Sequence, residues 1–116
     1  MSKVKKVFLH SFKKEILNSE KPCLVKFYSD TCYLCTGLES VFEEVSKAFG
    51  SEIDFYRVNT RVERRLNELF CGDGVPTLVY FLDGKGRELE WPAEPDPNSG
   101  YSFVQLCDYL TRKLSK

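Results

Sequence analysis

The chain of 116 residues contains 42% hydrophobic and 29% charged residues, the proportions of an ordinary globular protein. This length suits a single domain with one core, residues 1–116. The 17 basic and 17 acidic side chains cancel, and this balance argues against nucleic acid or an anionic membrane as a partner. No apolar run is long enough for a signal peptide or a membrane span, so we expect a cytoplasmic protein.

The first half of the chain alternates short apolar runs with helical periodicity. We expect an edge strand within residues 3–9 and a helix over residues 11–17, with Ser11 as its N-cap. Residues 23–28, CLVKFY, are an almost continuous apolar run, which predicts a buried central strand. Apolar residues then recur at helical spacing over residues 31–49.

The second half predicts two more helices and a hairpin. Residues 53–59 have the composition of a strand, and residues 61–70 that of a short, highly charged helix. The apolar strand 77–82 is joined through DGKG to a second strand at 87–91, which is a hairpin pattern. A loop with three prolines follows, and the amphipathic segment 101–114 predicts the last helix.

The order of these elements fixes the fold class. The early βαβ units require parallel strands joined by right-handed crossovers, while the late hairpin supplies antiparallel strands. We therefore expect an α/β protein with a central mixed sheet and helices on both of its faces.

Five cysteines occur in the chain, an odd number that cannot pair completely. Without a secretory signal, this count argues against a framework of structural disulfides. Cys32 and Cys35 form one close pair. Cys23 and Cys107 have the pattern of small core residues. Cys71 is interpreted as a partly buried thiol, with a second redox or dimerising thiol as the alternative.

The pair Cys32–Cys35 lies where a buried strand gives way to a helix. Free backbone N–H groups and the positive end of the helix dipole stabilise a thiolate at Cys32. Three positions apart on a helix, both sulfurs face the same side and can reach bonding distance. This context favours thiol–disulfide exchange. A zinc or Fe–S site stays open as an alternative but needs further ligands, for which only single cysteines and His10 remain. A purely structural pair also stays open.

Several motifs together resemble the thioredoxin family: LVKFYSDTCYLC, GVPT, TLVYF and the DGKG hairpin. The resemblance covers nearly the whole chain. Glutaredoxins share the Cys-x-x-Cys and Val-Pro-Thr motifs but begin almost directly at the cysteine strand, whereas this chain has a strand and a helix before it. The resemblance implies a thioredoxin fold.

The resemblance also implies an activity and its residues. Cys32 corresponds to the nucleophile and Cys35 to the resolving thiol of a thiol–disulfide oxidoreductase that acts on disulfide-containing proteins. Pro76 is expected to follow a cis peptide bond from Val75 and to present the Val75 backbone to an extended substrate. An ordinary trans turn proline is the alternative. The family needs no bound cofactor, and a thioredoxin-reductase-type donor, commonly NADPH-linked, supplies its electrons.

This sequence departs from the family pattern at several positions. Tyr33 and Leu34 replace the usual Gly-Pro between the cysteines, and we expect them to contact the substrate. Lys26 occupies the position of a buried carboxylate, so it is expected to tune the pKa of the site. A charged Lys26 favours the Cys35 thiolate, and a neutral one accepts the proton. In the third alternative its stem carries the amine to solvent.

Two further expectations follow from these departures. A cation at Lys26 and the loss of Gly-Pro both favour thiolates, so the redox couple should be more oxidising than that of a typical thioredoxin. Pro92 stands where the family has a groove glycine, so Trp91 is either a groove aromatic or a packing residue at the end of a strand. These changes leave one rival interpretation: a thioredoxin-fold binding or assembly module whose cysteine pair is structural or binds metal.

Overall fold

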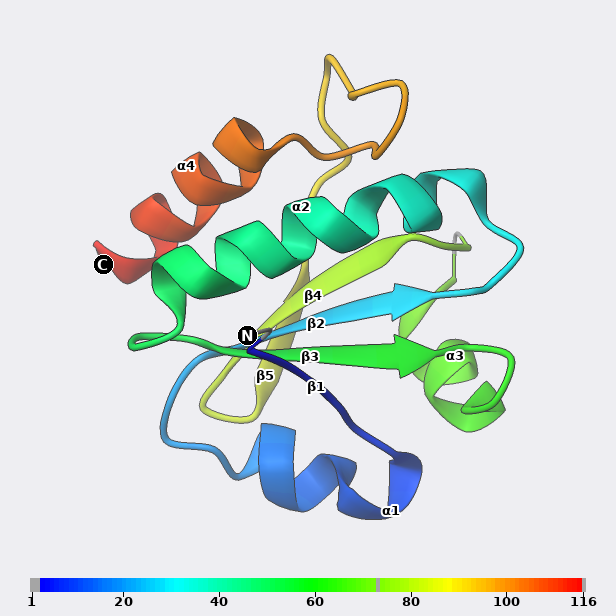
Figure 1. Ribbon diagram of the computed structural model, residues 1–116. Helices are drawn as coiled ribbons and strands as arrows, with labels where there is room; N and C mark the ends of the chain where they lie inside the picture. The colour runs from blue at the N-terminus through cyan, green and yellow to red at the C-terminus, as the bar shows by residue number, and fades with distance from the viewer. Residues whose placement is uncertain (1–2, 73, 116) are drawn as a thin grey trace.

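A computed structural model describes residues 3–72 and 74–115. Its mixed sheet has five strands in the order β1-β3-β2-β4-β5 (Figure 1). These strands are β1 (Val4–Lys6), β2 (Cys23–Tyr28), β3 (Asp54–Asn59), β4 (Thr77–Leu82) and β5 (Lys85–Glu88). β1, β3 and β2 are parallel, while β4 runs antiparallel to β2 and β5 antiparallel to β4. This is the mixed sheet that the sequence predicts.

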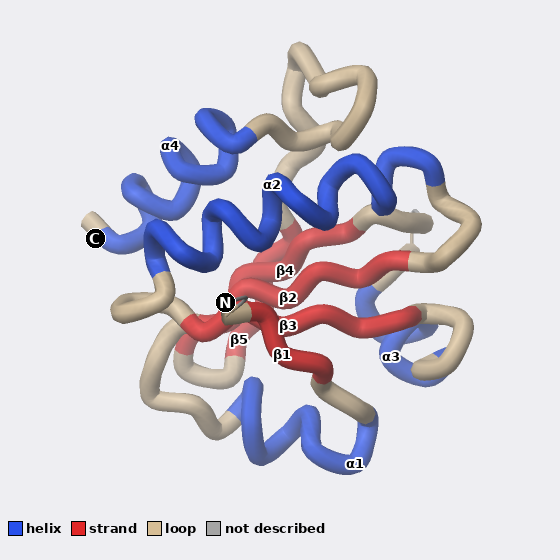
Figure 2. Tube along the Cα trace, viewed as in Figure 1, coloured by secondary structure: helices blue, strands red, loops and turns tan. Residues whose placement is uncertain are grey.

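The helices cover both faces of this sheet, as the tube in Figure 2 shows. α2 (Tyr33–Phe49) and α4 (Phe103–Leu114) lie on one face. The other face is covered by α3 (Arg64–Phe70) and by α1 (Leu9–Phe12), which continues as the π-helical turn η1 (Lys13–Leu17). The predicted α/β architecture with helices on both faces is confirmed.

Two apolar clusters form the core, one on each face of the sheet. Because successive side chains of a strand point to opposite faces, β2 contributes to both. Val25 and Phe27 join the cluster under α1 and α3, whereas Leu24 joins the one under α2 and α4. Burying such a side chain contributes about 1.5–3 kcal/mol. β2, buried on both faces, therefore holds the centre of the fold in place.

The first helix begins earlier than the sequence predicted. It starts at Leu9 with Phe8 as N-cap, and the Ser11 hydroxyl donates to the Phe8 carbonyl at 3.3 Å. Ser11 is therefore the third helical residue rather than the cap. The side chain of Glu63 accepts a hydrogen bond from the Leu9 backbone N–H, which satisfies one of the free donors of the first turn.

The hairpin is tighter than predicted, so the expected strand at 87–91 was wrong in its bounds. Asp83 and Gly84 both have positive φ, 53° and 78°, and two such residues close a hairpin whose twist matches its strands. Leu82 consequently pairs with Lys85, and β5 begins there. The strand ends at Glu88.

Two later helices, in contrast, start after their predicted positions. α3 begins at Arg64 because the preceding residues form a turn in which the Glu63 N–H donates to the Asn59 carbonyl at 2.8 Å. α4 begins after Ser102, whose hydroxyl accepts from the Gln105 N–H at 3.1 Å. Gln105 returns a bond to the Ser102 N–H. This capping box fixes the helix start.

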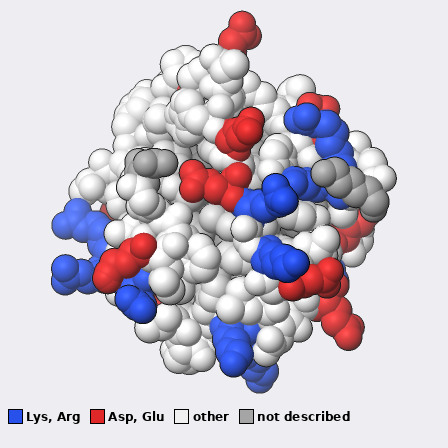
Figure 3. Space-filling model, turned by 180° about the vertical axis from the view of Figure 1, so that it is seen from behind, with Lys and Arg blue, Asp and Glu red and all other residues white. Residues whose placement is uncertain are grey.

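Charged side chains of both signs are interleaved over the face shown in Figure 3, as the zero net charge leads one to expect. Among the described residues, no helix is long and apolar enough to cross a membrane.

Candidate active site

The redox pair lies at the junction of β2 and α2. Cys32 is the N-cap of α2 with an extended backbone, and Cys35 lies one turn inside the helix. The two residues are joined by a disulfide with their Cα atoms 5.1 Å apart. The Cys35 backbone N–H donates to the Cys32 sulfur at 3.1 Å. A helix N–H therefore already points at the atom where a thiolate forms on reduction.

The two cysteines differ in their access to solvent. Cys32 is half-buried, whereas Cys35 is only 4% exposed. Of the two cysteines, Cys32 is therefore the more accessible from solvent.

The Val-Pro-Thr turn, distant in sequence, lies against the redox pair. The Cys32 sulfur is 3.8 Å from the Val75 carbonyl oxygen, and the Val75–Pro76 peptide bond is cis. Val75 is half-buried and Pro76 is buried. Gly74 takes a positive φ of 95°, a conformation for which glycine is favoured. The structure thus brings together the Cys-x-x-Cys and Val-Pro-Thr motifs, two of those on which the sequence resemblance rests.

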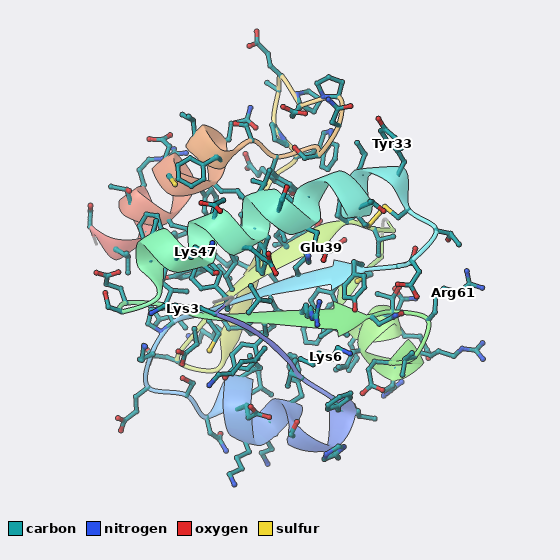
Figure 4. All side chains as sticks on the ribbon, in the orientation of Figure 1. Lys3, Lys6, Tyr33, Glu39, Lys47 and Arg61 are labelled. Carbon is teal, nitrogen blue, oxygen red and sulfur yellow. A yellow bond between two sulfur atoms is a disulfide. The ribbon has the colours of Figure 1, made fainter. Side chains whose placement is uncertain are left out.

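The two residues between the cysteines have different surroundings. Leu34 is half-buried, whereas Tyr33 is 72% exposed and projects outward from the start of α2 (Figure 4). The Tyr33 hydroxyl donates to Asn98 Oδ1 at 2.9 Å. The sequence analysis missed Asn98, since nothing in the pattern around it links that loop residue to a site 65 positions away.

Lys26 lies on the face of β2 that α2 covers, and it is only 3% exposed. Its ammonium group lies 5.1 Å from the centre of the Phe42 ring and 5.4 Å from that of Tyr28. The alternative in which the amine reaches bulk solvent does not fit this burial.

Burial lowers the pKa of Lys26 to about 8, opposed by Glu39 and Glu43 and reinforced by Arg57. Glu39 lies on the side of α2 that faces the strands (Figure 4). With a pKa of about 8, Lys26 is mostly protonated at neutral pH. This protonation state favours the alternative in which a charged Lys26 stabilises the Cys35 thiolate.

Comparison with known proteins identifies the family. The family model named Thioredoxin matches residues 3–96. A thioredoxin of Borreliella burgdorferi is 33% identical over 86 residues, which cover 72% of this chain and 74% of that protein. The chain belongs to the thioredoxin family. A solved Malassezia sympodialis thioredoxin shares its fold with a TM-score of 0.78 at 20% identity, covering 97% of this chain and 91% of that one.

Longer proteins match as well. Protein disulfide-isomerase tigA of Aspergillus niger is 32% identical over 106 residues, which span 89% of this chain but 28% of that protein. Membership of the family, together with the Cys32–Cys35 disulfide at the start of α2, makes this protein a thiol–disulfide oxidoreductase.

The other three cysteines of this thioredoxin-family protein do not join the site. Cys71 is buried, and burial raises the pKa of its thiol to about 11. Burial also raises the pKa of Cys23 and of Cys107. A protonated thiol is a poor nucleophile, which favours a packing role for these residues, with Cys23 and Cys71 in the core and Cys107 packed against it. Across residues 3–72 and 74–115, no group of three or more His, Cys, Asp or Glu residues is arranged to hold a metal ion.

Trp91 packs against its neighbours at the end of the hairpin. Its ring meets that of Tyr101 edge-on with centroids 5.3 Å apart. A Cβ added to Gly100 would lie 2.5 Å from the indole. These contacts favour the packing interpretation, although Trp91 as a residue remains 48% exposed.

Proposed function

We propose that this protein exchanges dithiol and disulfide with protein substrates, with Cys32 as the nucleophile and Cys35 as the resolving thiol. The observation that carries this assignment is the difference in access: Cys32 is half-buried at the N-terminus of α2, and Cys35 is buried one turn deeper.

The reaction balances in two steps. The Cys32 thiolate attacks one sulfur of a substrate disulfide, forming a mixed disulfide, and the second substrate sulfur leaves as a thiolate and takes up a proton. Cys35 then loses its proton and attacks the Cys32 sulfur. The Cys32–Cys35 disulfide forms and the substrate leaves as a dithiol. The substrate has gained two electrons and two protons, and the reverse sequence oxidises a dithiol.

Four residues beside the sulfur are proposed to bind the substrate. Val75 places its carbonyl oxygen 3.8 Å from the Cys32 sulfur, so an extended segment lying along this backbone brings its own disulfide to Cys32. Pro76 shapes that turn. Tyr33 and Leu34 contribute the surface on the opposite side of the nucleophile.

Lys26 is proposed to tune the resolving step. An ammonium group packed on the Phe42 ring and interacting with the Glu39 carboxylate favours negative charge on the sulfur of Cys35, which belongs to the same helix as these two residues. It is a positioning residue in this scheme, since it acts through Cys35 and does not touch the substrate.

The remaining proposals concern the cellular setting. A separate thioredoxin-reductase-type donor returns electrons to the Cys32–Cys35 disulfide, and no bound cofactor takes part. We infer a cytoplasmic location and a single domain over residues 1–116.

Reduction of insulin by dithiothreitol tests this function. The wild type should accelerate precipitation of the insulin chains, because Cys32 attacks insulin disulfides faster than the reagent does. Cys32→Ser should show only the reagent rate, while Cys71→Ser, which removes a buried thiol, serves as the matched control and should keep the wild-type rate. No acceleration by the wild type would favour the binding-module interpretation instead.

A further inference from the structure

A row of three cations crosses the sheet on the face that α2 covers. Lys6 of β1 (Figure 4) pairs laterally with Arg57 of β3, which in turn pairs with Lys26 of β2. Paired residues of neighbouring strands lie about 4.8 Å apart and project from the same face. Lys26 is buried, Arg57 is half-buried and Lys6 is exposed. Like charges at this spacing repel one another, and Arg57 accordingly helps to lower the pKa of Lys26.

The carboxylates near this row do not pair with it. Glu39 and Glu43 of α2 act on Lys26 electrostatically, but among the described residues none of the three cations forms an ion pair. The Nε–H of Arg57 is buried, and the described part of the chain gives it no hydrogen-bond partner. Folded proteins pair nearly all of their buried donors. Arg57 therefore needs an acceptor from outside these residues.

A cavity of about 150 Å³ lies beside Arg57, where the three strands end and the turn before α3 begins. Arg57 and Lys6 both line it, and Tyr28 and Asn59 add polar groups to its wall. Its volume is that of about five water molecules in the liquid. The cavity can therefore hold an ion of a few heavy atoms.

One carboxylate, that of Glu63, also lines this cavity. It accepts a hydrogen bond from the Leu9 backbone N–H at the start of α1. Within the described residues it forms no ion pair with Arg57 or Lys6. The cavity thus has two cations in its wall against one carboxylate that is already engaged by the backbone. This balance favours an anion as the occupant.

We propose that this cavity, here called the Arg57 cavity, binds a small tetrahedral oxyanion, inorganic phosphate or sulfate. The Arg57 guanidinium presents its donors in a planar fork that suits oxyanions, and Lys6 supplies a second positive charge. The bound ion provides the acceptor that Arg57 lacks and offsets the repulsion within the row of cations. The proposal goes beyond the redox function, because neither Arg57 nor Lys6 is assigned a part in disulfide exchange.

Titration of the oxidised protein with sodium phosphate tests the site. Backbone amide signals are followed by two-dimensional NMR at neutral pH, with sodium chloride keeping the ionic strength constant. The signals of Lys6, Arg57 and Glu63 should shift and reach saturation with a Kd of about 1 mM. Sodium sulfate is titrated in the same way, and the lower Kd identifies the ion that the cavity prefers.

Variants then assign the binding to the cavity. Arg57→Met removes the fork of donors and should weaken phosphate binding about tenfold. Arg57→Lys keeps the charge without the fork and should be intermediate. Lys6→Met changes an exposed side chain, so it should fold normally and weaken binding about threefold. Arg87→Met removes an exposed arginine of β5, at the opposite edge of the sheet, and should leave the Kd unchanged.

Stability gives a second readout. Without phosphate, Arg57→Met should be at least as stable as the wild type, because it removes a half-buried charge that has no partner. Phosphate should then raise the stability of the wild type more than that of the variant, since only the wild type binds the ion well.

Three results would overturn the proposal. One is the absence of saturable shifts in the wild type, and another is a Kd that neither Arg57→Met nor Lys6→Met changes. The third is a large loss of stability in phosphate-free Arg57→Met, which would mean that the chain itself pairs this guanidinium. All of these measurements use the oxidised protein without a disulfide substrate, so failure of the proposed function would leave them unaffected.

Discussion

The two faces of β2 are both buried, yet they carry different chemistry. Toward α1 and α3 the strand presents only apolar side chains, among them Val25 and Phe27, which pack with aromatic residues of those helices. Toward α2 it presents Lys26, an amine held against two aromatic rings. The first face contributes to stability through apolar packing, whereas the second buries an amine whose desolvation costs stability.

The largest expected effect is a loss of stability when a side chain on the apolar face of β2 is truncated. Phe27→Ala removes a fully buried ring that packs on Phe70 with centroids 5.6 Å apart, so the free energy of unfolding should fall by about 3–5 kcal/mol. Urea denaturation measures the change. A loss below about 1 kcal/mol would mean that this face is not the packed core described here.

On the face of β2 that α2 covers, replacing Lys26 is expected to increase the free energy of unfolding rather than to decrease it. A lowering of the Lys26 pKa from 10.5 to about 8 corresponds to a cost of about 3 kcal/mol at neutral pH. Lys26→Met keeps the volume and removes the charge, so it should stabilise the oxidised protein by about 2 kcal/mol at pH 7. Lys47→Met, at an exposed position of α2, is the matched control and should change stability little.

The difference in stability between the wild type and Lys26→Met should depend on pH. Between pH 8 and pH 10.5 the folded wild type has lost the Lys26 proton while the unfolded chain still holds it. The unfolded state then binds more protons, so wild-type stability rises with pH relative to Lys26→Met. Denaturant midpoints measured at pH 7 and pH 10 should show that the stability difference between the two proteins becomes smaller at the higher pH. A difference of constant size would contradict a lowered pKa at Lys26.

Most of this comparison was predictable from the sequence. The run CLVKFY indicates a strand buried on both faces, and its alternation places Lys26 opposite Val25. What the sequence did not show is how the amine is accommodated, because the rings and carboxylates around it come from other elements. Asn98 was missed for the same reason: its contact with Tyr33 depends on how the loop folds back over Gly37.

A smaller effect concerns the redox potential. If the Lys26 cation stabilises thiolates in the reduced protein, the wild-type potential should be less negative than the value of about −270 mV typical of thioredoxin. Lys26→Met should shift it to more negative values by on the order of 30 mV, which is about 1.4 kcal/mol for two electrons. Equilibration with glutathione buffers measures both values. A wild-type potential at or below that of an ordinary thioredoxin would refute the expectation.

The roles of the two cysteines are tested most directly by trapping. Reduced Cys35→Ser, incubated with disulfide-containing proteins, should accumulate mixed disulfides, and mass spectrometry should locate each of them at Cys32. Cys32→Ser should accumulate almost none at Cys35, because the Cys35 thiol is buried. If Cys32→Ser trapped partners through Cys35 while Cys35→Ser trapped none, the assignment of nucleophile and resolving thiol would be reversed.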